Sequence, residues 1–420
     1  MGQNGYRRAA GRFAARLGQG HLLYALEGFH NDGPFTRGDD FRKFNGVLRY
    51  SRGTAADGLS LTAMAYRARW NATDQIPLRA VRDGRLGRFD QVDASDGGAA
   101  HRYSLSGSWR ASTDAGASAL TASLVASLLD LYSNFTYFLD DPVNGDQFSQ
   151  PDRRVTAALN GEHRWGQQRI GFQFQNDNIY NGLYRTVARR RLATTRADHI
   201  VETSAALFYE VGTRWSAQLR SVAGVRADGY RFQVASDLAA NSGRRTAQLI
   251  SPSLSLVFGP WNKTELYLNA GRGFHSNDAR GTTQRIDPAS GAPAAPVTPL
   301  ARATGVELGV RSEAVAGWQS ALSLYRLDVA SELVFVGDAG TTEAGRPSRR
   351  TGIELSSYYK PNHGLTLDAD LAFARLSRCR CVRPGASPAR SKAWPRWRLR
   401  STISGPGSGR SNGAISARDR

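Results

Sequence analysis

The chain has 420 residues, a formal net charge of +19, 40% hydrophobic residues and 44 glycines. Its mean hydropathy is −0.43 and it has no run of eighteen apolar residues, which excludes a protein that crosses a membrane with helices. These values do not exclude a transmembrane β-barrel, because only every second residue of its strands meets lipid. Cys379 and Cys381 are the two cysteines, so residues 1–376 offer neither a disulfide framework nor a thiolate metal site.

Segment after segment alternates apolar and polar residues, and this period of two predicts β-strands with two differently solvated faces. The clearest examples are 44–50, 170–175, 207–211, 264–270, 306–311 and 365–373. In the last of these we expect Leu365, Leu367, Leu371 and Phe373 to face lipid. Asp368 and Asp370 would be costly in a dry core, so we expect them to face a wet lumen.

The predicted connections alternate in length. Short turns are expected near 17–20, 53–57, 113–116, 166–168, 212–215, 259–262, 314–317 and 360–364. Longer polar segments are expected near 31–40, 72–98, 133–152, 177–199, 233–245, 276–300 and 338–348. This pattern gives about sixteen strands with all the long loops at one end, as in outer-membrane barrels, whose periplasmic turns are short and extracellular loops long.

One segment favours a second interpretation. Leu120, Leu124, Leu128 and Leu131 have near-helical spacing, so an amphipathic helix is the alternative to a strand there. We predict a strand, because the neighbours on both sides are strands.

Five stretches resemble strands and loops of the TonB-dependent receptors, the gated barrels of the Gram-negative outer membrane. They are 22–35, 39–53, 131–155, 264–281 (TELYLNAGRGFHSNDARG) and 332–361. The resemblance covers about residues 5–377. It implies an all-β, antiparallel transmembrane barrel with long extracellular loops, incomplete here, with about 16 of the family's 22 strands. In the family a plug domain fills the barrel, a short box contacts TonB, and the cargo is a ferric siderophore, cobalamin or another scarce nutrient.

Three departures from that family are expected. No plug or TonB box has a counterpart here, and the N-terminal residues 1–13 have no apolar core of a signal peptide. The last strands also have no counterpart after Ser377. We therefore expect a partial receptor barrel over 5–377 and an Arg-rich disordered tail over 378–420.

The tail concentrates charge, with eleven Lys or Arg and one acid from Ser377 to Arg420, giving +10 and leaving +9 for residues 1–376. It has no strand period and a composition typical of disorder. Codons for Lys392 to Arg420 are compatible, when shifted by two nucleotides, with a hairpin that resembles the family's next one. We therefore expect a frameshifted read-through. The alternative is a basic extension that binds anionic lipid or nucleic acid.

Candidate sites have simpler structural explanations. Gly271 and Gly273 are expected to be strand glycines rather than a dinucleotide loop, because no βαβ unit surrounds them. The Asp140–Asp146 run is expected to form turns rather than a calcium loop. His275 is expected to be a polar loop residue, and Arg189–Arg191 solvated loop charge that could also attract an anion. We predict no enzyme and no catalytic, cofactor or metal residue.

Five tryptophans fall close to short turns, where an interfacial aromatic girdle would lie. They are Trp109, Trp165, Trp215, Trp261 and Trp318.

The leading functional hypothesis is an outer-membrane receptor chain whose intact form imports a scarce nutrient such as a ferric siderophore. Its expected partners are outer-membrane lipid, lipopolysaccharide, the TonB complex and an unknown small-molecule cargo, with no nucleic acid and no cofactor. A passive porin-like channel is the first alternative. A basic nucleic-acid-binding protein, suggested by a pI of 10.5, is the second.

Overall fold

A computed structural model describes residues 3–331, 333–336, 341–362, 364–378, 394–403 and 414–415. Sixteen long strands form one antiparallel meander. They are β1 (Arg7–Leu17), β2 (Gly20–Asn31), β3 (Phe41–Gly53), β4 (Gly58–Asn71), β5 (Gly97–Thr113), β6 (Gly116–Ser133), β7 (Phe148–Trp165), β8 (Gln168–Val187), β9 (Arg190–Arg214), β10 (Leu219–Ser236), β11 (Gly243–Trp261), β12 (Thr264–Ser276), β13 (Leu300–Ser312), β14 (Trp318–Val329), β17 (Ser348–Asn362) and β18 (Leu365–Arg378). This confirms the predicted all-β class and the number of strands.

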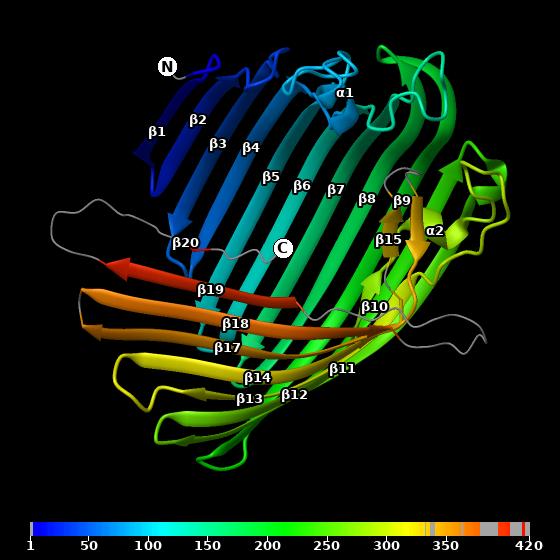
Figure 1. The fold of residues 1–420 in the computed structure, drawn as a ribbon. Coiled ribbons are helices and arrows are strands. Elements are labelled where there is room, and N and C mark those ends of the chain that lie inside the picture. Colours follow the sequence, from blue (N-terminus) through cyan, green and yellow to red (C-terminus); the bar gives the residue numbers. More distant parts are fainter. Residues whose placement is uncertain are drawn as a thin grey trace.

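The sheet curves along its length into a trough, and it is not closed (Figure 1). Each strand pairs with the next in the chain, and in the described residues no pairing joins β1 to β18. A small hairpin of β15 (Leu333–Val336) and β16 (Thr341–Ala344) forms a separate two-stranded sheet.

Helix is almost absent from the described ranges, which hold α1 (Leu78–Arg82), α2 (Ala279–Thr283) and the 3-10 turn η1 (Ala239–Asn241). None of these helices has the length and apolar character needed to cross a membrane. The segment with helical leucine spacing is strand β6, paired along its length with β5 and β7. The strand prediction is confirmed there, because partners on both sides supply the backbone hydrogen bonds that a helix would have made internally.

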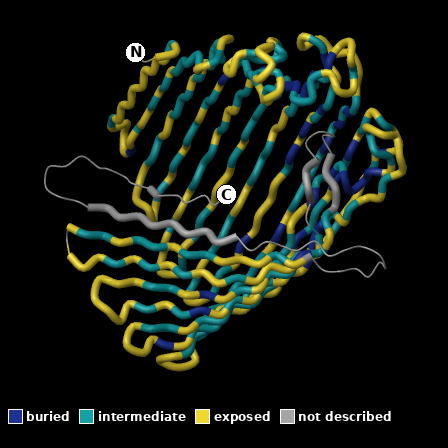
Figure 2. The backbone as a smooth tube through the Cα atoms, viewed as in Figure 1, coloured by how far each residue is buried: buried dark blue, intermediate teal, exposed yellow. Residues whose placement is uncertain are grey.

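One face of the sheet carries an apolar belt. The register lines up Leu266, Val310, Leu322, Leu355 and Leu371 across five neighbouring strands. Exposure alternates with the pleat along the strands (Figure 2), and many large apolar side chains on this face remain uncovered, such as Leu308 at 53%. We call it the outer face. Such a continuous uncovered belt is far larger than a soluble monomer exposes.

The opposite, inner face is the one on which α2 packs, against β9, β10 and β11. It carries polar side chains such as Asn160, Gln173 and Glu307. Phe208 is an aromatic side chain on this face where the alternation of apolar and polar residues is imperfect. Its ring lies under the Arg169 guanidinium, 4.9 Å from the ring centroid, and a side chain at Gly171 would collide with it. Glycine and a cation–π contact thus accommodate this ring on the polar face.

The loops follow the predicted polarity with one correction. The segment 134–147 precedes β7 and the turn at 166–167 follows it, so the two lie at opposite ends of that strand. The long loop predicted at 177–199 is wrong: β8 and β9 continue through it to a tight turn at Ala188 and Arg189. Polar residues such as Asn178 and Asn181 are common in loops and led to this prediction, yet each has a cross-strand partner in β9.

The tryptophans lie at the short-turn end, as predicted. Trp165 and Trp261 end their strands, Trp318 begins β14, and Trp215 follows β9 directly. The indole N–H groups of Trp215 and Trp318 donate to Ser221 and Ser357, both at 2.9 Å. Amphipathic rings of this kind suit a membrane interface.

The predicted tail falls mostly outside the described residues. Within 378–420 the structure describes Arg378 as the last residue of β18, together with β19 (Trp394–Ile403), paired with β18, and β20 (Ala414–Ile415), paired with β19. The boundary at residue 377 and the frameshift origin of the tail stay predictions, as does part of the loop at 338–348.

The face assignment predicts the cost of a charge on β18. Leu371→Arg, in the middle of the apolar belt, should lower the free energy of unfolding by about 2–4 kcal/mol in lipid vesicles, and Leu367→Arg, nearer the aromatic end, by less, because the cost falls with distance from the bilayer midplane. Denaturant titration in vesicles measures both. Asp370→Arg, on the inner face, is the matched control. A larger cost for this control than for Leu371→Arg would mean that the two faces are reversed.

Candidate inner-face site

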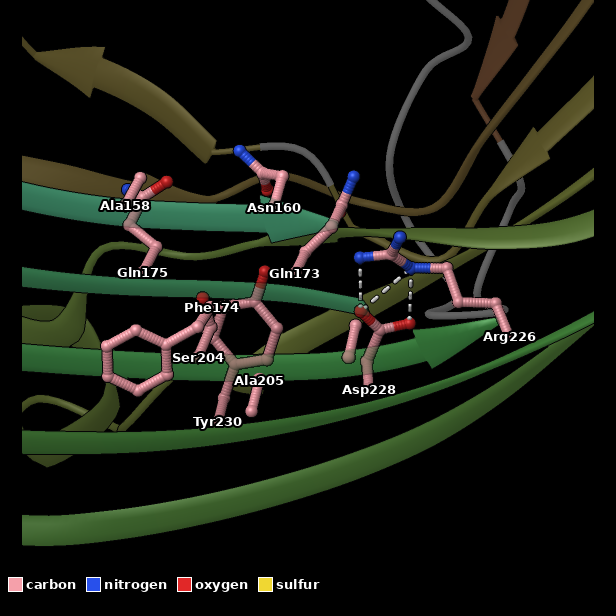
Figure 3. A pocket seen from close by; sticks show the side chains of 11 residues that line it. Ala158, Asn160, Gln173, Phe174, Gln175, Ser204, Ala205, Arg226, Asp228 and Tyr230 are labelled. Atoms are coloured by element: carbon pink, nitrogen blue, oxygen red, sulfur yellow. Dashed lines mark hydrogen bonds and ion pairs between the residues drawn. The ribbon is translucent and has the colours of Figure 1, made fainter. Parts of the chain in front are cut away.

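A polar pocket of about 130 Å³ lies on the inner face of β7 to β10 (Figure 3). The alternation of each strand brings between one and three polar side chains to it. Its polar lining consists of Asn160, Gln173, Gln175, Ser204, Arg226, Asp228 and Tyr230. Amides, hydroxyls and one ion pair can donate and accept hydrogen bonds in several directions, which suits a polar ligand or the backbone of another protein segment.

An ion pair anchors one end of the pocket. Arg226 Nε lies 3.0 Å from both carboxylate oxygens of Asp228, and its Nη2 lies 2.8 Å from one of them. The Asp228 side chain is only 1% exposed, whereas that of Arg226 is 33% exposed. The carboxylate therefore holds the guanidinium in place and leaves part of it free to contact a ligand.

The loop between β12 and β13 folds inward over the same face. Asp278 caps α2 by accepting from the Arg280 backbone N–H at 2.9 Å, and its carboxylate also receives the Arg280 guanidinium at 2.6 Å. Arg280 also donates to Asn181 on β8. Burial opposes the ionisation of Asp278, but the bonds and charge of Arg280 overcome it and lower the pKa of that carboxyl.

Apolar contacts hold this loop against the sheet. Ala279 from α2 and Leu300 from the start of β13 join a buried cluster with Ile179, Ile200, Phe232, Val234 and Leu249. Asn241, 1% exposed, fastens the rest of the loop, accepting from the backbone N–H groups of Arg285 and Ile286 at 2.8 and 2.9 Å. An ordered loop segment thus covers part of the inner face and narrows the space beside the sheet.

A second polar cluster joins the loops at this end of the sheet. Gln147 donates to Asp96 at 3.0 Å and to Ser95 at 2.7 Å, while the Arg189 guanidinium donates to the Ser95 carbonyl at 2.6 Å. Asp96 is 1% exposed. Burial is the main reason that the pKa of Asp96 is raised to about 7; the nearby charges of Asp93 and Asp74 add to it, and the Gln147 hydrogen bond opposes it.

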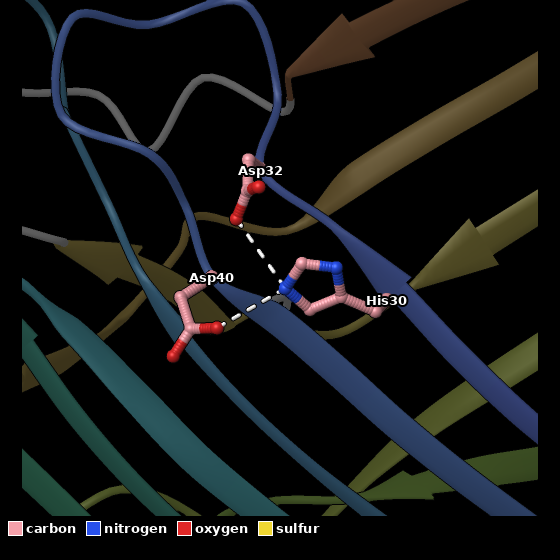
Figure 4. Close-up of side chains that lie close together, drawn as sticks. All are labelled: His30, Asp32 and Asp40. Atoms are coloured by element: carbon pink, nitrogen blue, oxygen red, sulfur yellow. Dashed lines mark hydrogen bonds and ion pairs between the residues drawn. The ribbon is translucent and has the colours of Figure 1, made fainter. Parts of the chain in front are cut away.

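Three side chains near the N-terminal edge have the spacing of metal ligands. His30 Nε2 lies 3.2 Å from Asp40 and 3.3 Å from Asp32 (Figure 4). Asp40 is already paired with Arg42 at 2.7 Å, and His30 Nδ1 lies 2.9 Å from the Gly5 carbonyl. Arg42 and the Gly5 carbonyl already partner members of this group, so a hydrogen-bond network that fastens the edge accounts for the arrangement.

The residues singled out from the sequence take structural roles. Asp146 accepts from the backbone N–H groups of Leu139 and Asp141 at 2.7 and 2.8 Å, which confirms the turn interpretation of that run. His275 is exposed at the end of β12. Arg189 is not merely solvated, because it ties two loops together.

The contacts that build the inner site join distant parts of the chain, and sequence reasoning missed them. Asn181 and Arg280 are 99 residues apart, and Asn241 and Ile286 are 45 apart. Only the Asp278 cap had a local signal, an Asp directly before a short helix.

A family model of the TonB-dependent receptor-like β-barrel matches residues 28–405. The chain belongs to the TonB-dependent receptors. Members of this family are receptors and transporters of the outer membrane, and the outer membrane is the location of this receptor chain. No curated protein matches it.

Solved structures of the family share the fold. The copper transporter OprC is 16% identical with a TM-score of 0.68, and the ferric citrate transporter FecA is 10% identical with a TM-score of 0.71. The ferric yersiniabactin uptake receptor FyuA from Yersinia pestis is 13% identical with a TM-score of 0.69. Each comparison covers 96% of this receptor chain. This chain spans 64% of the length of OprC, 62% of FecA and 65% of FyuA.

The part-buried pair of Asp278 and Arg280 in the inward loop predicts a local destabilisation. Arg280→Met leaves the part-buried Asp278 carboxylate, 24% exposed, without its cation. Breaking a fully buried pair costs about 3–5 kcal/mol, so a cost below that range is expected here. Hydrogen exchange at the Val297 amide, which donates to the Gly281 carbonyl at 2.8 Å, should accelerate accordingly. Arg85→Met is the control, because its pair with Asp83 is exposed and worth at most about 1 kcal/mol. Equal exchange in both variants would show that the pair does not hold the loop.

The pKa of Asp96 predicts a pH-dependent loop cluster. The folded value, about 7, lies above the ordinary carboxyl value of about 4, so the folded state binds the proton more tightly. Its stabilisation is full below pH 4 and is lost as the pH rises to 7. Asn134 donates its backbone N–H to the Asp96 carboxylate at 3.2 Å. Asp96→Asn should therefore slow exchange of this Asn134 amide relative to the parent chain at pH 7.5. Asp90→Asn is the control, and its effect on stability at this pH should have the opposite sign. Hydrogen bonds from Thr36 and Gly87 lower the pKa of Asp90, so its charged form is the one that the folded state stabilises. Faster exchange in Asp96→Asn at pH 7.5 would contradict the assignment.

Proposed function

We propose that this chain provides the barrel wall of a TonB-dependent receptor that imports a scarce nutrient such as a ferric siderophore. The single observation that carries the proposal is the inner face, where a polar pocket and an inward-folded loop narrow the path along the trough. Both features stand where a polar cargo that crosses the barrel would meet the wall. The solved neighbours are named as copper, ferric citrate and ferric yersiniabactin proteins, which favours a metal or metal chelate as the cargo class.

Import by a receptor of this kind is driven through TonB, and we propose the TonB complex as the partner of the intact protein. The pocket is compatible with either a cargo group or a segment filling the barrel. Its lining is mostly neutral, and its one cation, Arg226, is balanced by Asp228. We therefore expect the pocket to select by hydrogen bonding more than by net charge.

The test is cargo binding by the refolded chain. A panel of ferric chelates is screened by quenching of tryptophan fluorescence, and the best ligand is titrated against Asn160→Ala/Gln173→Ala. Losing two hydrogen-bonding groups of about 0.5–1.5 kcal/mol each should weaken binding roughly tenfold. Gln319→Ala, the same chemistry in β14 outside the pocket, is the matched control. Binding that is unchanged in the double variant, or equally weakened in the control, would remove the pocket from the cargo path.

A further inference from the structure

Three carboxylates gather around Asn134, where two long loops meet. Asp74, Asp93 and Asp96 belong to the loop between β4 and β5, and Asn134 is the first residue of the loop between β6 and β7. The Asn134 backbone N–H lies 3.1 Å from Asp74 and 3.2 Å from Asp96, and its Nδ2 donates to Asp93 at 3.0 Å. One asparagine thus joins the acids of one loop to the other loop.

The three acids also lie close to one another. The side chains of Asp74 and Asp96 are within hydrogen-bond distance. On the other side of Asp96, one amide nitrogen of Gln147 lies 3.0 Å from Asp96 and 3.3 Å from Asp93. Asp96 is therefore the central member, with a second carboxylate on each side.

The charge of this cluster is not balanced by ion pairs. In the part of the chain that the structure describes, none of the three carboxylates forms one, whereas the buried carboxylates of Asp198 and Asp228 are each paired with an arginine. Arg189 brings one positive charge, through hydrogen bonds to the Ser95 and Asp96 carbonyls at 2.6 and 3.2 Å. When all three acids are ionised, two negative charges remain, which one divalent cation would neutralise.

Asn134 also carries an oxygen that points to a ligand. This residue is 3% exposed, and its Oδ1 has no hydrogen-bond donor among the described residues. Because Nδ2 of the same amide contacts Asp93, Oδ1 lies beside the carboxylates. The Tyr137 hydroxyl is a second buried oxygen without a partner there. Buried oxygens of this kind are rarely left unsatisfied, and a cation would satisfy them together with the acids.

The position of Tyr137 supports the same cluster. Burial raises the pKa of the Tyr137 hydroxyl, and the charges of Asp74 and Asp96 raise it further. The hydroxyl therefore lies near both acids. Carboxylate, amide and hydroxyl oxygens together form a set of hard ligands, which suits calcium or magnesium rather than zinc or copper. Calcium accepts such oxygens in irregular geometry, whereas magnesium demands a near-ideal octahedron.

We propose that Asp74, Asp96 and the Oδ1 atom of Asn134 bind a calcium ion that joins the β4–β5 loop to the β6–β7 loop. Asp93 and Tyr137 complete its surroundings with one further charge and one hydroxyl oxygen. This inference goes beyond the proposed function, because the ion lies in the loops and the cargo pocket lies on the inner face of the strands. Calcium binding and cargo binding are therefore measured separately, and one can fail without the other.

The experiment follows hydrogen exchange of the Asn134 amide in the full chain, in neutral detergent micelles at pH 7.5 and constant ionic strength. Calcium chloride should slow this exchange with a midpoint of about 0.1–1 mM, the range of extracellular calcium modules. At ten times the dissociation constant the exchange should be slower by about tenfold. Exchange that does not change across this range, or that magnesium slows equally, would overturn the calcium site.

Two variants locate the ion. Asp74→Asn removes one ligand carboxylate at an exposed position, where the fold tolerates the change, and it should weaken calcium binding at least tenfold. Asp140→Asn is the matched control, because Asp140 is an exposed acid of the adjoining β6–β7 loop outside the cluster. A control variant that loses as much affinity would show general charge attraction and overturn the site.

Asp96→Asn separates calcium binding from simple relief of repulsion. The slower Asn134 exchange predicted above for this variant applies to calcium-free protein. In saturating calcium the order should reverse, because only the parent chain keeps the central ligand. A variant that still exchanges more slowly than the parent chain in saturating calcium would show that repulsion alone governs the cluster, and would overturn the proposal.

Discussion

Every backbone N–H and C=O that enters a hydrocarbon layer needs a partner inside the protein, and the antiparallel meander supplies these partners strand by strand. Once the ladder is set, the pleat forces neighbouring residues to opposite faces. The apolar belt on one face and the amides and charges on the other follow directly from that constraint. A slip of one residue in any pair would move its whole apolar set to the wet side. Register is thus the property on which both faces depend.

The inner face shows how polar groups become fixed where water would otherwise solvate them. The inward loop is held both by the apolar contacts of Ala279 and Leu300 and by a largely part-buried hydrogen-bond network through Asp278, Arg280 and Asn241. Such a network holds one arrangement strongly while it is complete and is costly when one member is lost. A loop held in this way can be ordered in one state and released by a competitor for a single partner. This property suits the cargo path proposed above.

Much of the fold could be predicted from the sequence, because a two-residue period is local and recurs in Ile170, Phe172 and Phe174 as it does in Val306, Leu308 and Val310. The helical spacing of Leu120 and Leu124 was overridden by pairing on both sides. The loop predicted at 177–199 was wrong because asparagines favour turns locally, whereas cross-strand partners decided the outcome. The candidate site could not be predicted, because its decisive contacts, such as Arg280 with Asn181, join residues far apart in the chain.

The two ends of the outer face differ for a physical reason as well. Each tryptophan at the short-turn end has an apolar ring and one N–H group that makes a polar contact. Such a side chain suits either membrane interface. Arginines at the long-loop end bring fixed charge, and a row of them repels itself unless anions lie between. Asp328 supplies that anion for Arg326 and Arg349.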